Sequence, residues 1–237
     1  MRVPTKKDAY RAHTTEVGFL LEFEKEYFDY KRYLTREKVI KSHVLKVLGW
    51  ASRVIDVNLL KGTNRIALDV GCAYGYSSQV LSQLGYRTIA IDLSKWGVQQ
   101  AKKNENGDFV VCDAQTTLPF REGIFDLVTC FDVLEHLDSP ETAIKQMLRT
   151  CSKALVCTTP NGTVEKYVKK IVGDYDETHV NSRSASHWKR SIVNVNHPKI
   201  VRVDTFLDLS GKMGQRFFHR SFKLPRLGST IRVAIVK

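Results

Sequence analysis

The sequence predicts an α/β protein with a mostly parallel sheet, and three observations support this fold class. Short apolar runs alternate with helical patterns from residue 65 onward. The first run leads into a turn with Gly71 and Gly75. Acidic residues stand at the ends of three successive runs, at Asp69, Asp92 and Asp113. Because parallel strands end at one edge of a sheet, these acids are expected to surround a single ligand site.

Residues 1–60 are expected to form an N-terminal helical extension or lid. Between residues 16 and 48, aromatic and leucine side chains recur at helical spacing, which is typical of a helix packed on a core. A cover over a substrate site is the alternative role of this segment. Thr35-Arg36-Glu37-Lys38 has the pattern of a new helix start. Residues 1–15 are polar and expected to fray.

Residues 61–237 are expected to form the main domain. Continuous apolar strands separated by helices predict a parallel sheet covered on both faces. Ser94 and Ser139 occupy N-cap positions, and Pro140 follows at a first helical position. Residues 163–199 are expected to form an insertion or cap over the substrate site. The expected strands are residues 65–70, 88–91, 109–112, 125–130, 153–157, 200–207 and 230–236, and the expected helices are residues 77–84, 95–103 and 141–150.

Composition limits the protein class. A chain of 237 residues with 43% hydrophobic content can bury a full core. No apolar run approaches the roughly 20 residues of a membrane helix, and the N-terminus lacks the apolar stretch of a secretory signal. The five cysteines are scattered without a CxxC pair. They indicate free, mostly buried thiols and a cytoplasmic location.

The positive charge is concentrated near the C-terminus. Residues 1–60 carry a formal charge of +4, residues 61–180 carry −2, and residues 181–237 carry +10. Such a field favours an acidic partner such as a phosphate or a nucleic acid, and a solvated basic face is the equal alternative. Within this region, residues 212–223 interleave cations with aromatics. This segment is expected to be a hairpin between the last strands, and a single-strand nucleic-acid surface is the alternative.

The turn and the strand-end acids suit a nucleoside ligand. Gly71 permits a sharp turn, and Gly75 permits close approach of a ligand to the main chain. The unpaired N–H groups of the following helix would point at this ligand. Asp69 could face a free amino group, Asp92 could accept hydrogen bonds from ribose hydroxyls, and Asp113 could accept one from an exocyclic amine.

These residues resemble a known family. Leu68-Asp69-Val70-Gly71-Cys72-Ala73-Tyr74-Gly75 is similar to the first motif, hDhGCGxG, of class I S-adenosylmethionine-dependent methyltransferases, with Ala73 in place of the middle glycine. The resemblance extends from residue 65 to about residue 162 and is closest to small-molecule enzymes of methyltransferase types 11 and 12. It implies a Rossmann-like three-layer α/β/α sandwich whose seven-stranded, mostly parallel sheet has an antiparallel last strand.

The resemblance also implies S-adenosyl-L-methionine as cofactor and a set of residues that bind it. A nicotinamide-binding Rossmann enzyme is the competing interpretation, but it normally requires GxGxxG, which this turn lacks. The implied cofactor-binding residues are Asp69, Gly71, Cys72, Tyr74, Gly75, Asp92, Leu93, Asp113, Ala114 and Phe131.

Two histidines are the candidate catalytic residues. His136 follows the fourth strand, and His179 lies in a segment resembling the D-x-x-H-h-N stretch of small-molecule methyltransferases. Asp132, Glu135, His136 and His179 together resemble the E-x-x-E-H…H metal cluster of methyltransferases that modify quinone phenols or the terminal ribose of small RNAs. Asp132 departs from that pattern, and no metal is assigned.

The sequence therefore predicts an S-adenosylmethionine-dependent methyltransferase acting on a small-molecule, anionic acceptor. An RNA-directed enzyme that methylates a 2′-oxygen or a base is the first alternative. A cofactor-binding protein without catalysis is the second.

Overall fold

A single mixed sheet organises the chain. The computed structural model describes residues 23–172, 176, 178–196, 198–213 and 216–237. Neighbouring strands follow the order β3-β2-β1-β4-β5-β8-β6-β7. The first five strands in this order, β3 to β5, are parallel. β8 is antiparallel to both of its neighbours, β5 and β6. The strands are β1 (Ile66–Val70), β2 (Arg87–Asp92), β3 (Asp108–Val111), β4 (Phe125–Phe131), β5 (Cys151–Pro160), β6 (Ile200–Met213), β7 (Arg216–Lys223) and β8 (Thr230–Val236).

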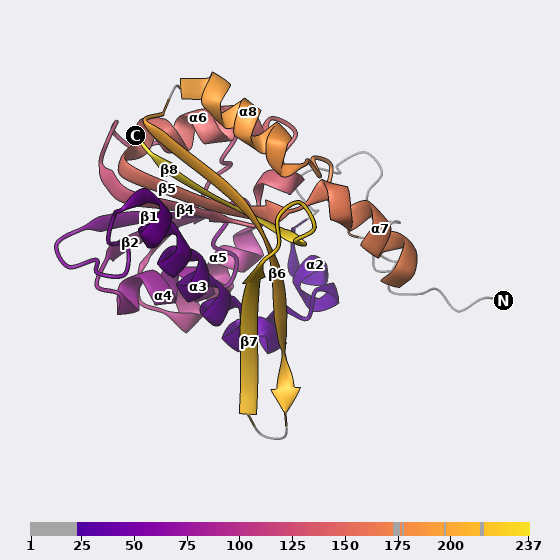
Figure 1. The fold of residues 1–237 in the computed structure, drawn as a ribbon. Helices are drawn as coiled ribbons and strands as arrows, with labels where there is room; N and C mark the ends of the chain where they lie inside the picture. The colour runs from indigo at the N-terminus through magenta and orange to yellow at the C-terminus, as the bar shows by residue number, and fades with distance from the viewer. Residues whose placement is uncertain (1–22, 173–175, 177, 197, 214–215) are drawn as a thin grey trace.

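The sheet has eight strands, so the expected number of seven is wrong by one. β6 continues past residue 207 to Met213 and pairs with β7 as an antiparallel hairpin. Gly211, which lies beyond the expected strand at residues 200–207, is inside β6 and pairs with Phe218. The expected hairpin at residues 212–223 is therefore present, and it forms an additional edge of the sheet. Figure 1 shows this hairpin projecting beyond the rest of the sheet.

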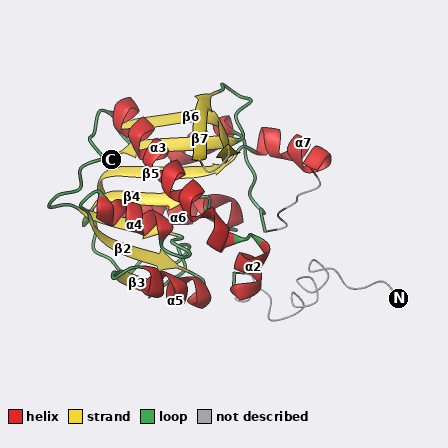
Figure 2. Cartoon of the chain, turned by 90° about the horizontal axis from the view of Figure 1, so that it is seen from below, coloured by secondary structure: helices red, strands yellow, loops and turns green. Residues whose placement is uncertain are grey.

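Helices cover both faces of the sheet, which confirms the three-layer sandwich (Figures 1 and 2). α3 and α4 pack on one face, and α6 and α8 pack on the other. Successive side chains of a strand point to opposite faces of the sheet, which explains this arrangement. Leu68 and Val70 pack in the core beneath α6 and α8, whereas Ala67 packs in the core beneath α3 and α4. The helices are α2 (Lys25–Tyr30), α3 (Glu37–Ile55), α4 (Tyr76–Gln83), α5 (Lys95–Asn104), α6 (Pro140–Thr150), α7 (Gly162–Val172) and α8 (Ala185–Asn196), with short 3-10 turns η2 (Tyr33–Arg36) and η3 (Leu134–His136).

The N-terminal segment divides into two parts with different roles. The described part of the expected helix between residues 16 and 48 is broken at Arg32, whose φ of 49° lies in the left-handed region. α3 begins at Glu37, as the Thr35–Lys38 pattern predicts. Its buried face, including Val44, Val47 and Leu48, belongs to a core layer. α2 and η2 lie instead over the strand ends, and residues 1–22 are outside the described part.

Local signals in the sequence are only partly realised. The Ser94 hydroxyl accepts a hydrogen bond from the Gly97 N–H at 2.8 Å, which confirms this N-cap. Ser139 occupies the N-cap position of α6 as predicted, but its side chain makes no capping hydrogen bond. Pro140 begins α6, where a missing N–H costs nothing. All five cysteines are free, and four are buried.

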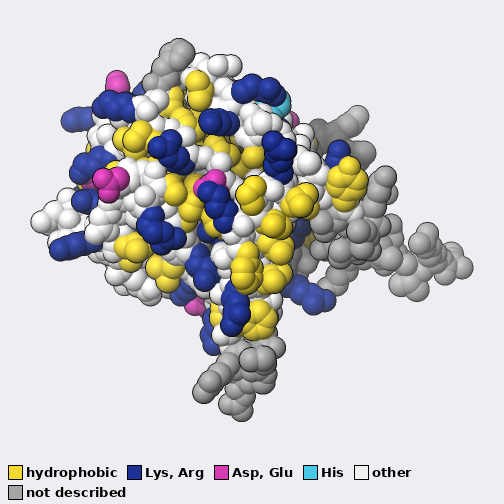
Figure 3. Space-filling model, in the orientation of Figure 1, with side chains coloured by type: hydrophobic (Ala, Val, Ile, Leu, Met, Phe, Trp, Pro, Cys, Tyr) yellow, Lys and Arg dark blue, Asp and Glu magenta, His cyan; other side chains and the backbone are white. Residues whose placement is uncertain are grey.

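One face of the molecule is rich in basic side chains (Figure 3). Figure 3 shows Lys and Arg side chains distributed over one face, with few acidic side chains and several exposed hydrophobic ones among them. Phe218 and Phe222 of β7 are among the exposed large hydrophobic residues. Among the described helices, none combines the length and apolar character needed to cross a bilayer.

Candidate cofactor and acceptor site

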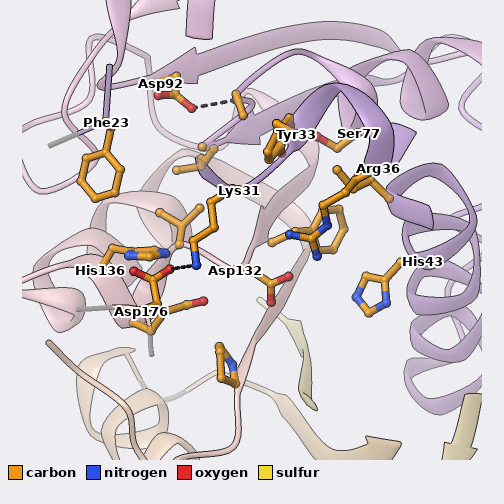
Figure 4. Close-up of a pocket in the computed structure, with 18 of the residues that line it drawn as sticks. Phe23, Lys31, Tyr33, Arg36, His43, Ser77, Asp92, Asp132, His136 and Asp176 are labelled. Carbon is orange, nitrogen blue, oxygen red and sulfur yellow. Dashed lines mark hydrogen bonds and ion pairs between the residues drawn. The ribbon is translucent and has the colours of Figure 1, made fainter. Parts of the chain in front are cut away.

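A cavity of about 510 Å³ lies at the carboxyl ends of β1, β2 and β4. This is where open α/β sheets bind ligands, at the point where the strand order reverses between β1 and β4. Figure 4 shows Asp92, Asp132 and His136 on its wall together with residues of the N-terminal segment. The cavity therefore joins the strand-end residues to the expected lid.

The glycine turn leaves β1 with three residues at positive φ. Gly71 and Gly75 have φ of 76° and 78°, and Ala73 adopts 48° without being glycine. The N–H groups of Gly71 and Cys72 both donate to the Ile91 carbonyl, at 2.8 and 3.0 Å. These bonds hold the turn against β2 and bring its main chain beside the cavity.

Asp92 is held by two backbone N–H groups at the wall of the cavity. One carboxylate oxygen accepts from the Ser94 N–H at 2.8 Å, and the other accepts from the Ala73 N–H at 2.7 Å. The side chain also lines the cavity, so unused lone pairs face the ligand space. Burial raises the pKa of Asp92 to about 6, although the two backbone N–H groups oppose this shift.

Asp69 lies beneath the turn rather than on the cavity wall. It is 1% exposed and accepts hydrogen bonds from Ser77, Ser78 and Thr129 at 2.5, 2.7 and 2.9 Å. Burial raises the pKa of this carboxyl, and the three hydroxyls partly compensate. In this structure Asp69 thus ties β1 to α4 and β4.

Most of the sequence-predicted site residues converge on the cavity. Cys72 is buried, and Tyr74 packs in an aromatic cluster with Phe28 and Tyr33. A Cβ on Gly75 would meet Ala101 and Phe109, so this glycine serves packing against α5. Those on the wall are Gly71, Asp92, Leu93, Asp113, Ala114, Phe131, His136 and His179, whereas Asp69, Cys72, Tyr74 and Gly75 do not line it.

His136 presents an uncharged imidazole to the cavity. Its Nδ1 lies 2.8 Å from the Thr178 hydroxyl oxygen and 3.2 Å from the Thr178 carbonyl oxygen. The hydroxyl donates its own proton to Asp176 at 2.6 Å, so both oxygens can accept from His136 and Nδ1 carries the proton. Nε2 is then the basic nitrogen. Burial, followed by the influence of His179, lowers the pKa of His136 to about 4. A neutral imidazole of this kind can receive a proton from a hydroxyl acceptor.

His179 is held between two carboxylates. Its Nδ1 lies 2.5 Å from Glu165 and its Nε2 lies 3.4 Å from Asp176. Asp176 in turn pairs with Lys31 at 2.5 Å (Figure 4). Burial alone would raise the pKa of Asp176, but hydrogen bonds from Lys31 and Thr178 lower it to about 2. Both ring nitrogens of His179 thus face carboxylates, and Asp176 makes the contact with Lys31 at the end of α2.

The four residues that resemble a metal cluster are only partly brought together in the structure. Glu135, His136 and His179 have donor atoms within 4.8 Å of one another. Asp132 is outside this group, and its carboxylate accepts from Thr158 at 2.9 Å. Glu135 is fully buried, and burial raises the pKa of its carboxyl well above the usual range. Three of the four residues are therefore close together, and Asp132 is not.

The N-terminal segment supplies wall residues that the sequence did not single out. Phe23, Tyr27 and Phe28 line the cavity, and the Phe23 ring meets His136 edge-on at 5.4 Å between centroids. Tyr33 and Arg36 of η2 also line the cavity (Figure 4). The aromatic spacing was visible in the sequence, but it indicated core packing at least as strongly. Both roles are present, since Phe28 is 3% exposed and also faces the cavity.

Comparison with known proteins places the central region in a defined group. Residues 68–154 match the family described as "Methyltransferase domain". The ubiquinone biosynthesis O-methyltransferase of Paraburkholderia xenovorans (strain LB400) is 32% identical over 119 residues, covering 47% of this chain and 51% of the relative. The corresponding protein of Xanthomonas oryzae pv. oryzae (strain PXO99A) is 30% identical over 129 residues, covering 52% and 54%. The chain thus spans about half the length of the curated relatives it matches.

Solved structures agree on the fold. An S-adenosylmethionine-dependent methyltransferase from Thermotoga maritima aligns with a TM-score of 0.67 at 14% identity, over 88% of this chain and 94% of that one. The magnesium protoporphyrin IX methyltransferase of Synechocystis PCC 6803, solved with bound S-adenosylhomocysteine, aligns with a TM-score of 0.58 at 17% identity, over 86% and 87%.

Proposed function

Because the chain belongs to the class I S-adenosylmethionine-dependent methyltransferases, we propose that it methylates a hydroxyl group of a small-molecule acceptor. The observation that carries this proposal is the neutral His136 imidazole, which lines the same cavity as Asp92. The curated relatives are O-methyltransferases by name, which supports oxygen as the acceptor atom.

The residues around the cavity fit the cofactor. Asp92 is a carboxylate with acceptor capacity left on the wall, and Asp113 stands beside it at the end of β3. When bound, S-adenosylmethionine supplies a methyl group already activated on a sulfonium. Asp92 would hold the ribose, Asp113 the adenine edge, and Phe131 would pack beside the cofactor.

The remaining wall would position the acceptor. The aromatic side chains of Phe23 and Tyr27 would exclude water, and His136 would take the acceptor proton at Nε2. We infer that α2 and η2 act as the lid of this space, joined to the far wall by the Lys31–Asp176 ion pair. An anionic acceptor would meet Arg36, although carboxylates outnumber cations around the cavity.

Cofactor affinity should depend on the protonation of Asp92. Ribose hydroxyls donate to the ionised carboxylate, and the pKa of Asp92 in the empty site is about 6. Affinity should therefore be full above this pH and fall as pH falls through it, by about tenfold at pH 5. Titration calorimetry with S-adenosylhomocysteine between pH 5 and 7.5 measures this. Asp92→Asn should bind more weakly with a flat profile, and an equal slope in both proteins would exclude Asp92 as the group responsible.

The base role of His136 separates catalysis from cofactor binding. His136→Gln should lower kcat by about 100-fold or more while leaving the Kd for S-adenosylhomocysteine unchanged within about twofold. Turnover is measured by S-adenosylhomocysteine release with a panel of phenols and hydroxy acids. The exposed His187 provides the control, because His187→Gln should match the parent. Full activity in His136→Gln would contradict the base role, and no turnover of any acceptor despite cofactor binding would favour the non-catalytic alternative.

The RNA-directed alternative has one observation on its side. Phe218, Arg220 and Phe222 occupy alternate positions of β7 and are all exposed, so they share an outward face. Such a strip suits base stacking with phosphate neutralisation. Retention on heparin with steep salt dependence, lost in Arg220→Ala, would support this alternative over the small-molecule one.

A further inference from the structure

A second group of polar side chains lies on the cavity wall, apart from the strand ends that face the cofactor. His43 comes from α3, Asp208 from β6 and His219 from β7. All three line the cavity, and Figure 4 shows His43 beside it on α3. Neither the cofactor site nor the base described above uses these residues.

The donor atoms of this group face one another without forming hydrogen bonds. Nδ1 of His43 lies 3.7 Å from Oδ2 of Asp208, and Nε2 of His219 lies 3.6 Å from Oδ1. With one donor atom taken from each residue, the three atoms lie within 4.8 Å of one another. Ligands at about 2.0–2.1 Å in tetrahedral zinc geometry stand roughly 3.4 Å apart. The observed separations are therefore close to those of a set of ligands around one ion.

Neighbouring side chains orient two of the three residues, His219 and Asp208. The Ser42 hydroxyl lies 3.0 Å from Nδ1 of His219, so Nδ1–H can donate to it and leave the Nε2 lone pair facing Asp208. Arg232 and Ser221 both donate to Oδ1 of Asp208, the former at 2.7 Å. Within the described residues, Oδ2 of Asp208 and Nε2 of His43 are buried and have no hydrogen-bond partner. Hydrogen bonds such as those made by Ser42, Arg232 and Ser221 hold metal ligands in position in metalloproteins.

The pattern of β7 also indicates a site rather than core packing. His219 and Ser221 point inward beside α3, whereas the phenylalanines at positions 218 and 222 are exposed. An edge strand that only packed on a core would bury its aromatic side chains and expose the polar ones. The side chain of His219 is 2% exposed.

We propose that His43, Asp208 and His219 bind one divalent transition-metal ion of the zinc class on the cavity wall. Two imidazoles and one carboxylate form a donor set typical of zinc. The open coordination position would face the cavity. There the ion would polarise an acceptor oxygen and lower its pKa, a role that rests on the function proposed above.

Cobalt tests the site because its visible absorption reports coordination directly. The tag-free, chelator-treated chain is titrated with Co²⁺ alone and then with Zn²⁺ alone, without cofactor or acceptor. We expect one Co²⁺ equivalent with tetrahedral absorption and no thiolate charge-transfer band, displaced by Zn²⁺. His43→Gln and His219→Gln should each weaken binding of this equivalent by at least about 100-fold, and Ser42→Ala should weaken it about tenfold.

Matched variants separate this site from the other histidines. His136→Gln and the exposed His187→Gln should retain the cobalt equivalent. Absence of binding to the parent chain, or binding that persists in both His43→Gln and His219→Gln, would overturn the proposal. S-adenosylhomocysteine affinity, measured on the same variants, checks that they fold. It also keeps the outcomes distinct, because a chain that binds cobalt but no S-adenosylhomocysteine would retain the metal site and lose the proposed function.

Discussion

Replacing Trp188 with alanine is expected to lower the free energy of unfolding by about 4 kcal/mol. Trp188 is 0% exposed and belongs to the core between α6, α8 and the sheet. The guanidinium of Arg183 covers its ring at 4.9 Å. The small side chain would leave a large cavity in a layer that cannot collapse without moving α8. Urea unfolding followed by circular dichroism measures the loss.

The neighbouring His187→Ala variant is the control, since an exposed position should change stability by no more than about 0.5 kcal/mol. The comparison tests the expectation that residues 163–199 cover the substrate site. If Trp188→Ala altered kcat or KM but left stability within about 1 kcal/mol, α8 would be a mobile cap. A large stability loss with unchanged kcat and KM would agree with the packing of α8 on the sheet.

Gly71→Ala is expected to destabilise the fold by about 3 kcal/mol. Two effects add here, because φ is 76° and a Cβ would lie 2.2 Å from Cγ2 of Val133. The same change should weaken S-adenosylhomocysteine binding, since the turn beside the cavity would shift. Denaturant unfolding and calorimetry measure the two effects.

Two further variants separate the causes. Gly123 has φ of 63° with nothing within 4 Å of an added Cβ, so Gly123→Ala should cost only about 1 kcal/mol. The double variant Gly71→Ala/Val133→Ala removes the clash and keeps the strained φ. Equal losses in Gly71→Ala and Gly123→Ala would show that the contact with Val133 contributes nothing.

The local elements were predictable because their signals lie within a few residues. The β1 turn, the N-cap at Ser94 and the start of α3 at Glu37 all follow from short patterns. The parallel core was predictable too, since apolar strands separated by helices have few alternative arrangements. The depth of Asp69 was not, because a strand-end acid can face a ligand or the three hydroxyls that surround it here.

The cavity wall shows the same limit. Asp92 and Asp113 were found because they end neighbouring strands, and His136 because it follows β4. Lys31 and Arg36 were not found, since a cation on a helical segment is usually solvated. Only the fold of α2 and η2 over the strand ends gives these cations a place beside the cavity (Figure 4).

Local patterns predicted strands β1 to β5 with the helices α4, α5 and α6, the glycine turn and the acidic strand ends, because each depends on side-chain period or on a neighbouring strand. The eighth strand of the sheet, the packing of α8 on its face, and the meeting of His43 with Asp208 and His219 became visible only in the folded chain. These features join segments far apart in the chain. Their geometry depends on strand register and helix packing, which no local pattern encodes.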